Sequence, residues 1–158
     1  MTNNIKPFCN LNSKLLILGS FPSVISRQNG FFYANKQNRF WKVISAVFDE
    51  KEPLNLTDKK SLLLKHNIAL WDIIQSCNIK GSSDASISNL KINNIAKLLE
   101  YSPITHIFTN GGKASLLYQK YILKHTLMQN YALPSTSPAN ARFSLEKLIN
   151  EWKILSRI

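Results

Sequence analysis

Four short apolar segments, each ending in small or polar residues, divide the chain. They are KLLILGS (residues 14–20), NIALWDII (67–74), ITHIFTN (104–110) and LMQNYALPS (127–135). Runs of this length and composition are typical of strands that are buried on both faces of a parallel sheet. We therefore predict four strands at these positions.

Between these segments the apolar positions follow a helical spacing. Residues 38–48 carry apolar side chains at i, i+3, i+4 and i+7, from Phe40 to Val47. Thr57 is the expected N-cap of a helix over residues 58–66. Similar stripes occupy residues 92–99, 112–121 and 145–152. Strands alternating with helices predict an α/β protein, a three-layer α/β/α sandwich around a central four-stranded parallel sheet, in a single domain over residues 1–158.

The net charge of +11 is unevenly distributed along the chain. Neither residues 1–48 nor residues 101–145 contain an Asp or Glu, and all nine acids lie in the remaining parts. This sorting favours a surface that faces a polyanion. A general bias toward Lys and Asn is the alternative, and it explains the lysines better than the placement of the acids.

Several classes of protein do not fit the composition. No apolar run approaches the roughly 20 residues that cross a bilayer, and the N-terminus lacks the apolar core of a signal peptide, so we expect a cytoplasmic protein. Cys9 and Cys77 cannot supply an iron–sulfur cluster, and the three His residues are scattered. We expect no metal and no cofactor.

Two loops rich in Ser and Pro follow predicted strands. GSFPS (19–23) comes after the first strand and LPSTSPANA (133–141) after the fourth. The carboxyl ends of parallel strands meet at one edge of the sheet, where functional loops lie. Serine hydroxyls and backbone N–H groups can hold phosphate oxygens, although PSTSP taken alone is equally compatible with an ordinary surface turn.

A third segment, NGFFYANKQNRFWKV (29–43), gathers aromatic rings, amides and positive charge without an acid. A surface that meets bases and phosphates uses both features, whereas a helix that buries the rings leaves the charge incidental. The order of the three segments resembles the uracil-DNA glycosylase superfamily, and within it the hypoxanthine- (deoxyinosine-) DNA glycosylase branch, near the mismatch-specific uracil glycosylases. The resemblance covers residues 14–152, and NRFW and LPSTSPANA are its more specific elements.

The resemblance implies an enzyme that flips a damaged base out of DNA and hydrolyses its N-glycosidic bond. Many members use an Asp or Asn in the first loop and a His or Asn at the start of the second. Phe21 and Leu133 stand at those positions here and cannot act in that way. The hypoxanthine branch lacks the same pair and relies on the Asn of its NRFW-type motif, which is Asn38. We expect the Asn38 carbonyl to accept a hydrogen bond from the attacking water while its NH₂ orients a second partner.

The expected base-binding residues surround the first loop. Gly19, Ser20 and Phe21 offer backbone N–H groups to the departing base, and the Phe21 ring offers an apolar wall. By resemblance Tyr33 stacks on the flipped base. Asp72 ends the second strand, where its carboxylate can accept the ring N–H that uracil and hypoxanthine share; a buried helix or loop cap is the alternative.

Phe40 and Trp41 are expected in the core. The expected DNA contacts come mainly from the second loop, and Asn140 lies where the family inserts a wedge into the duplex. The residues are Ser23, Asn110, Ser135, Thr136, Ser137, Asn140 and Arg142.

These features predict a monofunctional DNA glycosylase for hypoxanthine, without lyase activity, that acts in base excision repair as a monomer. The expected partner is damaged DNA, as duplex or single strand, and we expect no contact with a membrane. A uracil-DNA glycosylase for G·U mismatches or single strands presents the same pattern, because both bases carry a carbonyl beside an N–H. The apolar Phe21 and Leu133 keep a non-catalytic lesion-binding protein open as a further alternative. A nucleotide-binding domain is disfavoured, because no phosphate-binding glycine motif is present.

Overall fold

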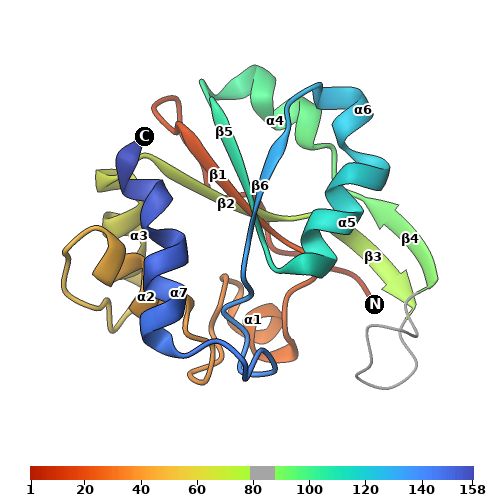
Figure 1. Cartoon of the computed structure of the whole chain (residues 1–158). Coiled ribbons are helices and arrows are strands. Elements are labelled where there is room, and N and C mark those ends of the chain that lie inside the picture. The colour runs from red at the N-terminus through yellow and green to blue at the C-terminus, as the bar shows by residue number, and fades with distance from the viewer. Residues whose placement is uncertain (79–87) are drawn as a thin grey trace.

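The computed structural model describes residues 1–78 and 88–158. Its central sheet contains β1 (Leu15–Gly19), β2 (Ile68–Asp72), β5 (His106–Asn110) and β6 (Asn130–Leu133), all parallel and in the order β2-β1-β5-β6 (Figure 1). The four predicted strands and the α/β/α fold class are confirmed. The fourth strand is shorter than expected, because pairing with β5 covers only four residues.

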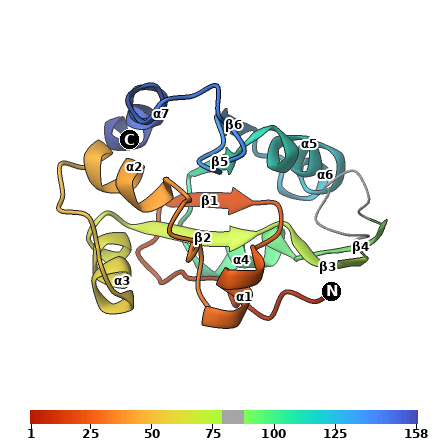
Figure 2. The ribbon, with the colours of Figure 1, turned by 90° about the horizontal axis from the view of Figure 1, so that it is seen from below.

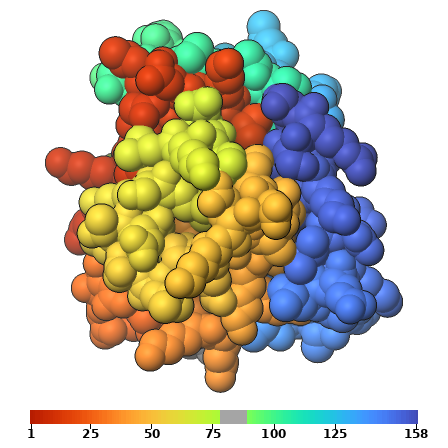
Figure 3. Space-filling model, turned by 90° about the vertical axis from the view of Figure 1, so that its left-hand side faces the viewer, coloured from red at the N-terminus to blue at the C-terminus, as the bar shows by residue number. Residues whose placement is uncertain are grey.

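Helices cover both faces of this sheet. One face carries α2 (Phe40–Val47), α3 (Leu56–Lys65) and α7 (Leu145–Trp152), which Figure 3 shows closing that side of the molecule. The other carries α4 (Ile95–Tyr101), α5 (Gly112–Tyr121) and α6 (Leu123–Thr126). In β1 the side chains of Leu15 and Ile17 join the first core and those of Leu16 and Leu18 the second, as the two-residue period of a strand requires. Figure 2 shows β1 beside its parallel neighbour β2.

Several elements were not expected from the sequence. A short helix, α1 (Val24–Asn29), follows the first loop, and β3 (Ile74–Asn78) pairs antiparallel with β4 (Ser88–Ile92) in a separate two-stranded sheet. The chain ends in a 3₁₀ helix, η2 (Lys153–Arg157). The expected N-cap Thr57 was wrong, since the side chain of Asn55 accepts the hydrogen bond from the Asp58 N–H at 2.9 Å and α3 begins at Leu56.

The segment before β1 runs along the outer edge of β2. Phe8 and Leu70 exchange backbone hydrogen bonds of 2.9 Å in both directions, and the Asn3 N–H bonds to the Gln75 carbonyl at 2.8 Å. This pairing covers the edge of the sheet and brings the Asn3 side chain beneath the end of β2. Within the described ranges, no helix has the length and apolar character needed to cross a bilayer.

Candidate active site

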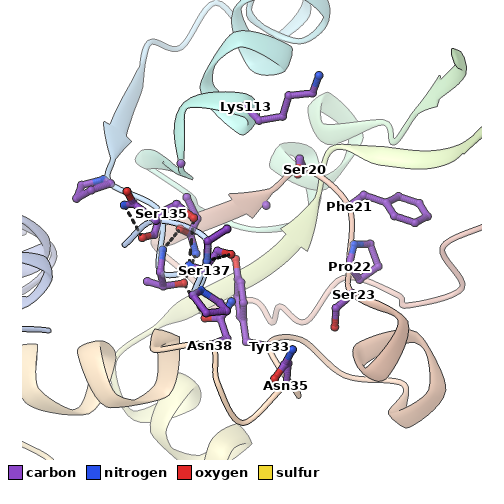
Figure 4. Close-up of a pocket in the computed structure, with 18 of the residues that line it drawn as sticks. Ser20, Phe21, Pro22, Ser23, Tyr33, Asn35, Asn38, Lys113, Ser135 and Ser137 are labelled. Carbon is purple, nitrogen blue, oxygen red and sulfur yellow. Dashed lines mark hydrogen bonds between the residues drawn. The ribbon is translucent and has the colours of Figure 1, made fainter. Parts of the chain in front are cut away.

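A cleft of about 820 Å³ opens at the carboxyl edge of the central sheet. One side is formed by the turn after β1, with Ser20, Phe21, Pro22 and Ser23 in sequence, and the opposite side by Tyr33, Asn38 and the loop around Ser135 and Ser137 (Figure 4). Apart from Asp72, every lining residue comes from one of the two acid-free stretches. The sorting of charge seen in the sequence therefore coincides with this cleft.

The side chain of Asn38 is fixed by two hydrogen bonds to its carbonyl oxygen. The Thr136 hydroxyl donates at 2.8 Å and the Phe40 N–H at 2.9 Å. An amide oxygen has two lone pairs, and both are occupied. We expected this carbonyl to accept a hydrogen bond from the attacking water, and here Thr136 and Phe40 take both of its acceptor positions. The NH₂ group has no hydrogen-bond partner among the described residues and is the part of the side chain left for a ligand.

Thr136 connects Asn38 to the end of β5. Its hydroxyl accepts a hydrogen bond from the Asn110 side-chain NH₂ at 3.0 Å, and its backbone N–H donates to the Asn110 side-chain Oδ1 at 3.1 Å. Thr136 is fully buried, so the expected contact of this residue with DNA was wrong. Sequence position could place Thr136 in the loop, but not show that its hydroxyl faces inward.

Asp72 lies at the floor of the cleft beside Gly19. It is 4% exposed, and its carboxylate accepts a long hydrogen bond of 3.4 Å from the Asn3 NH₂. Burial raises the pKa of Asp72 to about 7, and the bond from Asn3 lowers it in part. A Cβ on Gly19 would lie 2.6 Å from the Asp72 Oδ1 and 3.3 Å from the Tyr33 hydroxyl. Only glycine leaves room for these two polar groups.

Tyr33 extends from a strained backbone position into the same region. Its φ of 52° is in the left-handed region, which is rare for a bulky residue and tends to occur at functional sites. One ring face stacks on Phe40 with 4.0 Å between centroids. Burial raises the pKa of Tyr33, the charge of Asp72 raises it further, and contact with the Asn110 side chain lowers it. The core positions expected for Phe40 and Trp41 are confirmed.

The Phe21 ring does not form the expected wall for a base. It points away from Tyr33 and Ser135 in Figure 4, packs against the second core, and carries the Arg27 guanidinium 5.2 Å above its centre. Leu133 is 7% exposed and belongs to the first core.

The serine hydroxyls at the cleft stabilise their own turns. Ser23 caps α1 by accepting from the Ser26 N–H at 3.1 Å, Ser135 accepts from Ser137 at 3.1 Å, and Ser137 accepts from Ala139 at 3.2 Å. The Ser23 O–H donates to the Ser26 hydroxyl at 3.1 Å, whereas the O–H groups of Ser135 and Ser137 remain available as donors. Ser20, Asn140 and Arg142 also line the cleft, and Arg142 is exposed.

Sequence reasoning missed Arg39, although it stands beside Asn38 in the NRFW motif. Its guanidinium donates hydrogen bonds to the carbonyl oxygens of Ser137, Asn140 and Phe143. The motif could have indicated this role, because an Arg in an acid-free stretch has no neighbouring carboxylate to pair with and needs other acceptors, such as backbone carbonyls. In the described part of the chain, no three His, Cys, Asp or Glu side chains gather as metal ligands would.

The comparisons with known proteins agree with this geometry. The family model of the uracil DNA glycosylase superfamily matches residues 6–156. The chain belongs to this superfamily. It is 33% identical over 147 residues to a hypoxanthine DNA glycosylase of Methanosarcina acetivorans and 29% identical over 147 residues to one of Methanosarcina barkeri, with 92% of each chain covered in both cases. The solution NMR structure of a candidate uracil DNA glycosylase from Methanosarcina acetivorans superposes with a TM-score of 0.82 at 30% identity, over 99% of both chains.

Membership of the uracil DNA glycosylase superfamily makes this chain a DNA glycosylase, a hydrolase of N-glycosyl bonds with DNA as its substrate. This favours catalysis over simple lesion binding. In this structure Phe21 is turned away and Leu133 is buried, while Asn38, Tyr33 and Asp72 line the cleft.

Proposed function

We propose that this DNA glycosylase releases deaminated bases, chiefly hypoxanthine, in base excision repair. The observation that carries the proposal is the Asn38 amide, whose carbonyl is held by Thr136 and Phe40 while its NH₂ remains at the cleft. The name of the two curated relatives, hypoxanthine DNA glycosylase, supports the choice of base.

The proposed chemistry follows from the charges that develop as the bond breaks. The sugar becomes positive and the departing base negative. The Asn38 NH₂ donates a hydrogen bond to the departing base and stabilises its negative charge, as a donor in an oxyanion hole does. Backbone N–H groups at Ser20 and Phe21 add to this effect, and the phosphates of the DNA stabilise the sugar cation. Asn38 thus acts on the leaving group rather than on the water.

We propose that Asp72 and Tyr33, which line the cleft, select the base. Ionised Asp72 accepts the ring N–H that hypoxanthine and uracil carry and that unprotonated adenine and cytosine lack at that nitrogen. Tyr33 offers the ring face that Phe40 does not cover for stacking. Uracil is the second candidate substrate, because it presents the same edge and because the structural relative is a candidate uracil DNA glycosylase.

We propose that the hydroxyls of Ser135 and Ser137 donate to DNA phosphates, together with Arg142. Ser23 joins them when its O–H turns from the Ser26 hydroxyl to a phosphate oxygen. Asn110 and Asn140 also line the cleft, and we propose that both contact the DNA. Asn110 lies next to Thr136, and Asn140 belongs to the loop that we expect to contact the DNA. The enzyme acts as a monomer and stops at the abasic site, since a lyase step needs a desolvated amine and Lys113 at the cleft wall is exposed.

A panel of oligonucleotides tests the proposal. Duplexes and single strands each carry one hypoxanthine, uracil or xanthine, and abasic product is detected by alkaline strand cleavage. We expect hypoxanthine to be released fastest in single-turnover reactions, with no strand break before alkali. Faster release of uracil would move the assignment to the second candidate. Tight, salt-dependent binding without abasic product from any of the bases would contradict both.

A further inference from the structure

Arg39 connects the two sides of the cleft through its side chain and its backbone. The guanidinium donates to the carbonyl oxygens of Ser137 at 2.9 Å, Asn140 at 3.0 Å and Phe143, and the Arg39 N–H donates to the Thr136 carbonyl at 3.0 Å. All four acceptors belong to residues 134–144, called here the β6–α7 loop. One residue at the start of α2 therefore forms hydrogen bonds with four residues of this loop.

Among the described residues, carbonyl dipoles and no carboxylate stabilise the Arg39 charge. In residues 1–78 and 88–158, Arg39 forms no salt bridge with a carboxylate, and its Nε is buried without a partner. A guanidinium stays charged at any ordinary pH, and hydrogen bonds from a charged donor are roughly twice as strong as neutral ones. The protonation state of Arg39 therefore does not change with pH, and the three bonds are charge-assisted at every assay pH.

The start of the β6–α7 loop is also held by the bonds of Thr136 to Asn38 and Asn110 and by the Trp152 indole N–H, which donates to the Pro134 carbonyl at 3.0 Å. From Ser137 onward the long-range hydrogen bonds of the loop to other described residues are those of Arg39. The loop contains neither helix nor strand, and its internal hydrogen bonds join residues that are close in sequence, as from Ser137 to Ser135 and from Ala139 to Ser137. Such turns set local conformation but not the distance of the loop from α2. The bonds of Arg39 supply that constraint.

The same bonds orient the outer surface of the loop. In a trans peptide the carbonyl and the next N–H point in opposite directions. Because the Asn140 carbonyl points toward Arg39, the N–H of Ala141 points away from it, and Ala141 and Arg142 are both exposed. An outward N–H beside an exposed Arg suits a phosphate oxygen.

We propose that Arg39 is a positioning residue for base excision: it places the β6–α7 loop against the DNA backbone and, through Thr136, orients the Asn38 amide. The inference rests on the proposed function of the cleft. The Arg39 N–H holds the Thr136 carbonyl while the Thr136 hydroxyl holds Asn38. Contact with DNA thereby depends on the Arg39 side chain. Orientation of the reactive amide depends on the Arg39 backbone N–H and on the placement of the loop that the side chain holds.

Three variants test this role. They are Arg39→Ala, Arg39→Lys and the control Lys42→Ala, which removes one exposed charge from α2 outside the cleft. For each we would measure the single-turnover rate of hypoxanthine release at saturating enzyme, the Kd for the same DNA, and hydrogen exchange of residues 134–144 without DNA. Arg39→Ala is also assayed with millimolar guanidinium chloride and, for comparison, with ammonium chloride.

We expect Arg39→Ala to lower the saturated release rate by about 10- to 100-fold, the effect of losing hydrogen bonds from a charged donor. Exchange of the loop amides should accelerate. Arg39→Lys should restore little, because a compact ammonium cannot span three carbonyls. Guanidinium should restore part of the rate and ammonium none, a response that a general loss of folding would not give. Lys42→Ala should stay within about twofold of the wild type.

An unchanged saturated rate with unchanged loop exchange in Arg39→Ala would overturn the proposal. If Arg39→Ala does not fold, Arg39→Lys decides, and wild-type rate and exchange in that variant would overturn it equally. Hydrogen exchange needs no catalysis. A wild-type chain that releases no base would therefore refute the proposed function, while the exchange result would still judge the role of Arg39 in placing the loop.

Discussion

The Thr136 hydroxyl donates a 2.8 Å hydrogen bond to the carbonyl oxygen of Asn38, across 98 residues of sequence. The Phe40 N–H occupies the second lone pair of the same oxygen. An Asn38 side chain turned end over end would place its NH₂ against the Phe40 N–H. The network therefore admits one orientation of the amide, with the NH₂ left for the substrate.

Replacing Thr136 by Val removes this hydroxyl while keeping the shape of the side chain. We expect release of hypoxanthine to slow by about 10-fold, because Asn38 loses one of the two hydrogen bonds that hold its carbonyl oxygen. This is the effect expected when one buried hydrogen bond is removed and its partner is left unpaired. Thr136→Ser keeps the hydroxyl and should lie close to the wild type. Single-turnover rates measure the difference, and equal rates for the Val and Ser variants would show that the hydroxyl does not position Asn38.

Gly19 should not tolerate a side chain. In Gly19→Ala the new Cβ would lie 2.6 Å from the Asp72 carboxylate and 3.3 Å from the Tyr33 hydroxyl, so both must move. We expect a loss of about 1–3 kcal/mol in the free energy of unfolding, as in other overpacked cores, together with slower base release. Urea denaturation measures the stability. The matched control is Gly112→Ala, whose Cβ meets nothing within 4 Å, and an equal stability loss there would contradict the steric account.

Asp72 should make the protein less stable as the pH rises. Its pKa is raised from 3.8 to about 7, so the folded state holds a proton that the unfolded state releases between these values. The free energy of unfolding therefore falls as the pH rises through this window, by up to roughly 3–5 kcal/mol from this group. Asp72→Asn resembles the protonated form. It should match the wild type near pH 4 and exceed it at pH 8 in urea denaturation; a difference independent of pH would refute this.

Ionisation of Asp72 should raise the activity as the pH rises, whereas it lowers the stability. Only ionised Asp72 accepts the ring N–H of hypoxanthine, so kcat/KM should rise with pH through about 7 and then level off, since this parameter reports the free enzyme. Asp72→Asn should lose this dependence. A wild-type profile that is flat between pH 6 and pH 8, or one that the Asn variant shares, would remove Asp72 from base recognition.

The sequence predicted the central sheet because its strands are buried on both faces and read as continuous apolar runs, such as Leu15 to Leu18. It missed β3 and β4 because that two-stranded sheet is half polar and lacks such a run. The helix α3 was found but its cap was misplaced by two residues, since Asn55 and Thr57 are both good caps and only the backbone decides between them.

The residues of the site could be named from the sequence, but not their partners. Asn38, Tyr33 and Asp72 do line one cleft. Contacts between distant segments turn Thr136 inward and Phe21 away from the other cleft residues. They also let Arg39 hold carbonyl groups about 100 residues further along the chain. No local spacing of apolar and polar residues encodes such contacts.

The most direct test concerns the group that Asn38 presents to the base. Asn38→Asp keeps an oxygen for Thr136 and Phe40 but replaces the NH₂ by a negatively charged oxygen, whereas Asn38→Ala removes both ends. We expect single-turnover release of hypoxanthine to fall by about 10²–10³ in both variants, with Asp no better than Ala, because an anion cannot stabilise a departing anion. An Asp variant as fast as the wild type would instead make this residue an acceptor for the attacking water and contradict the account.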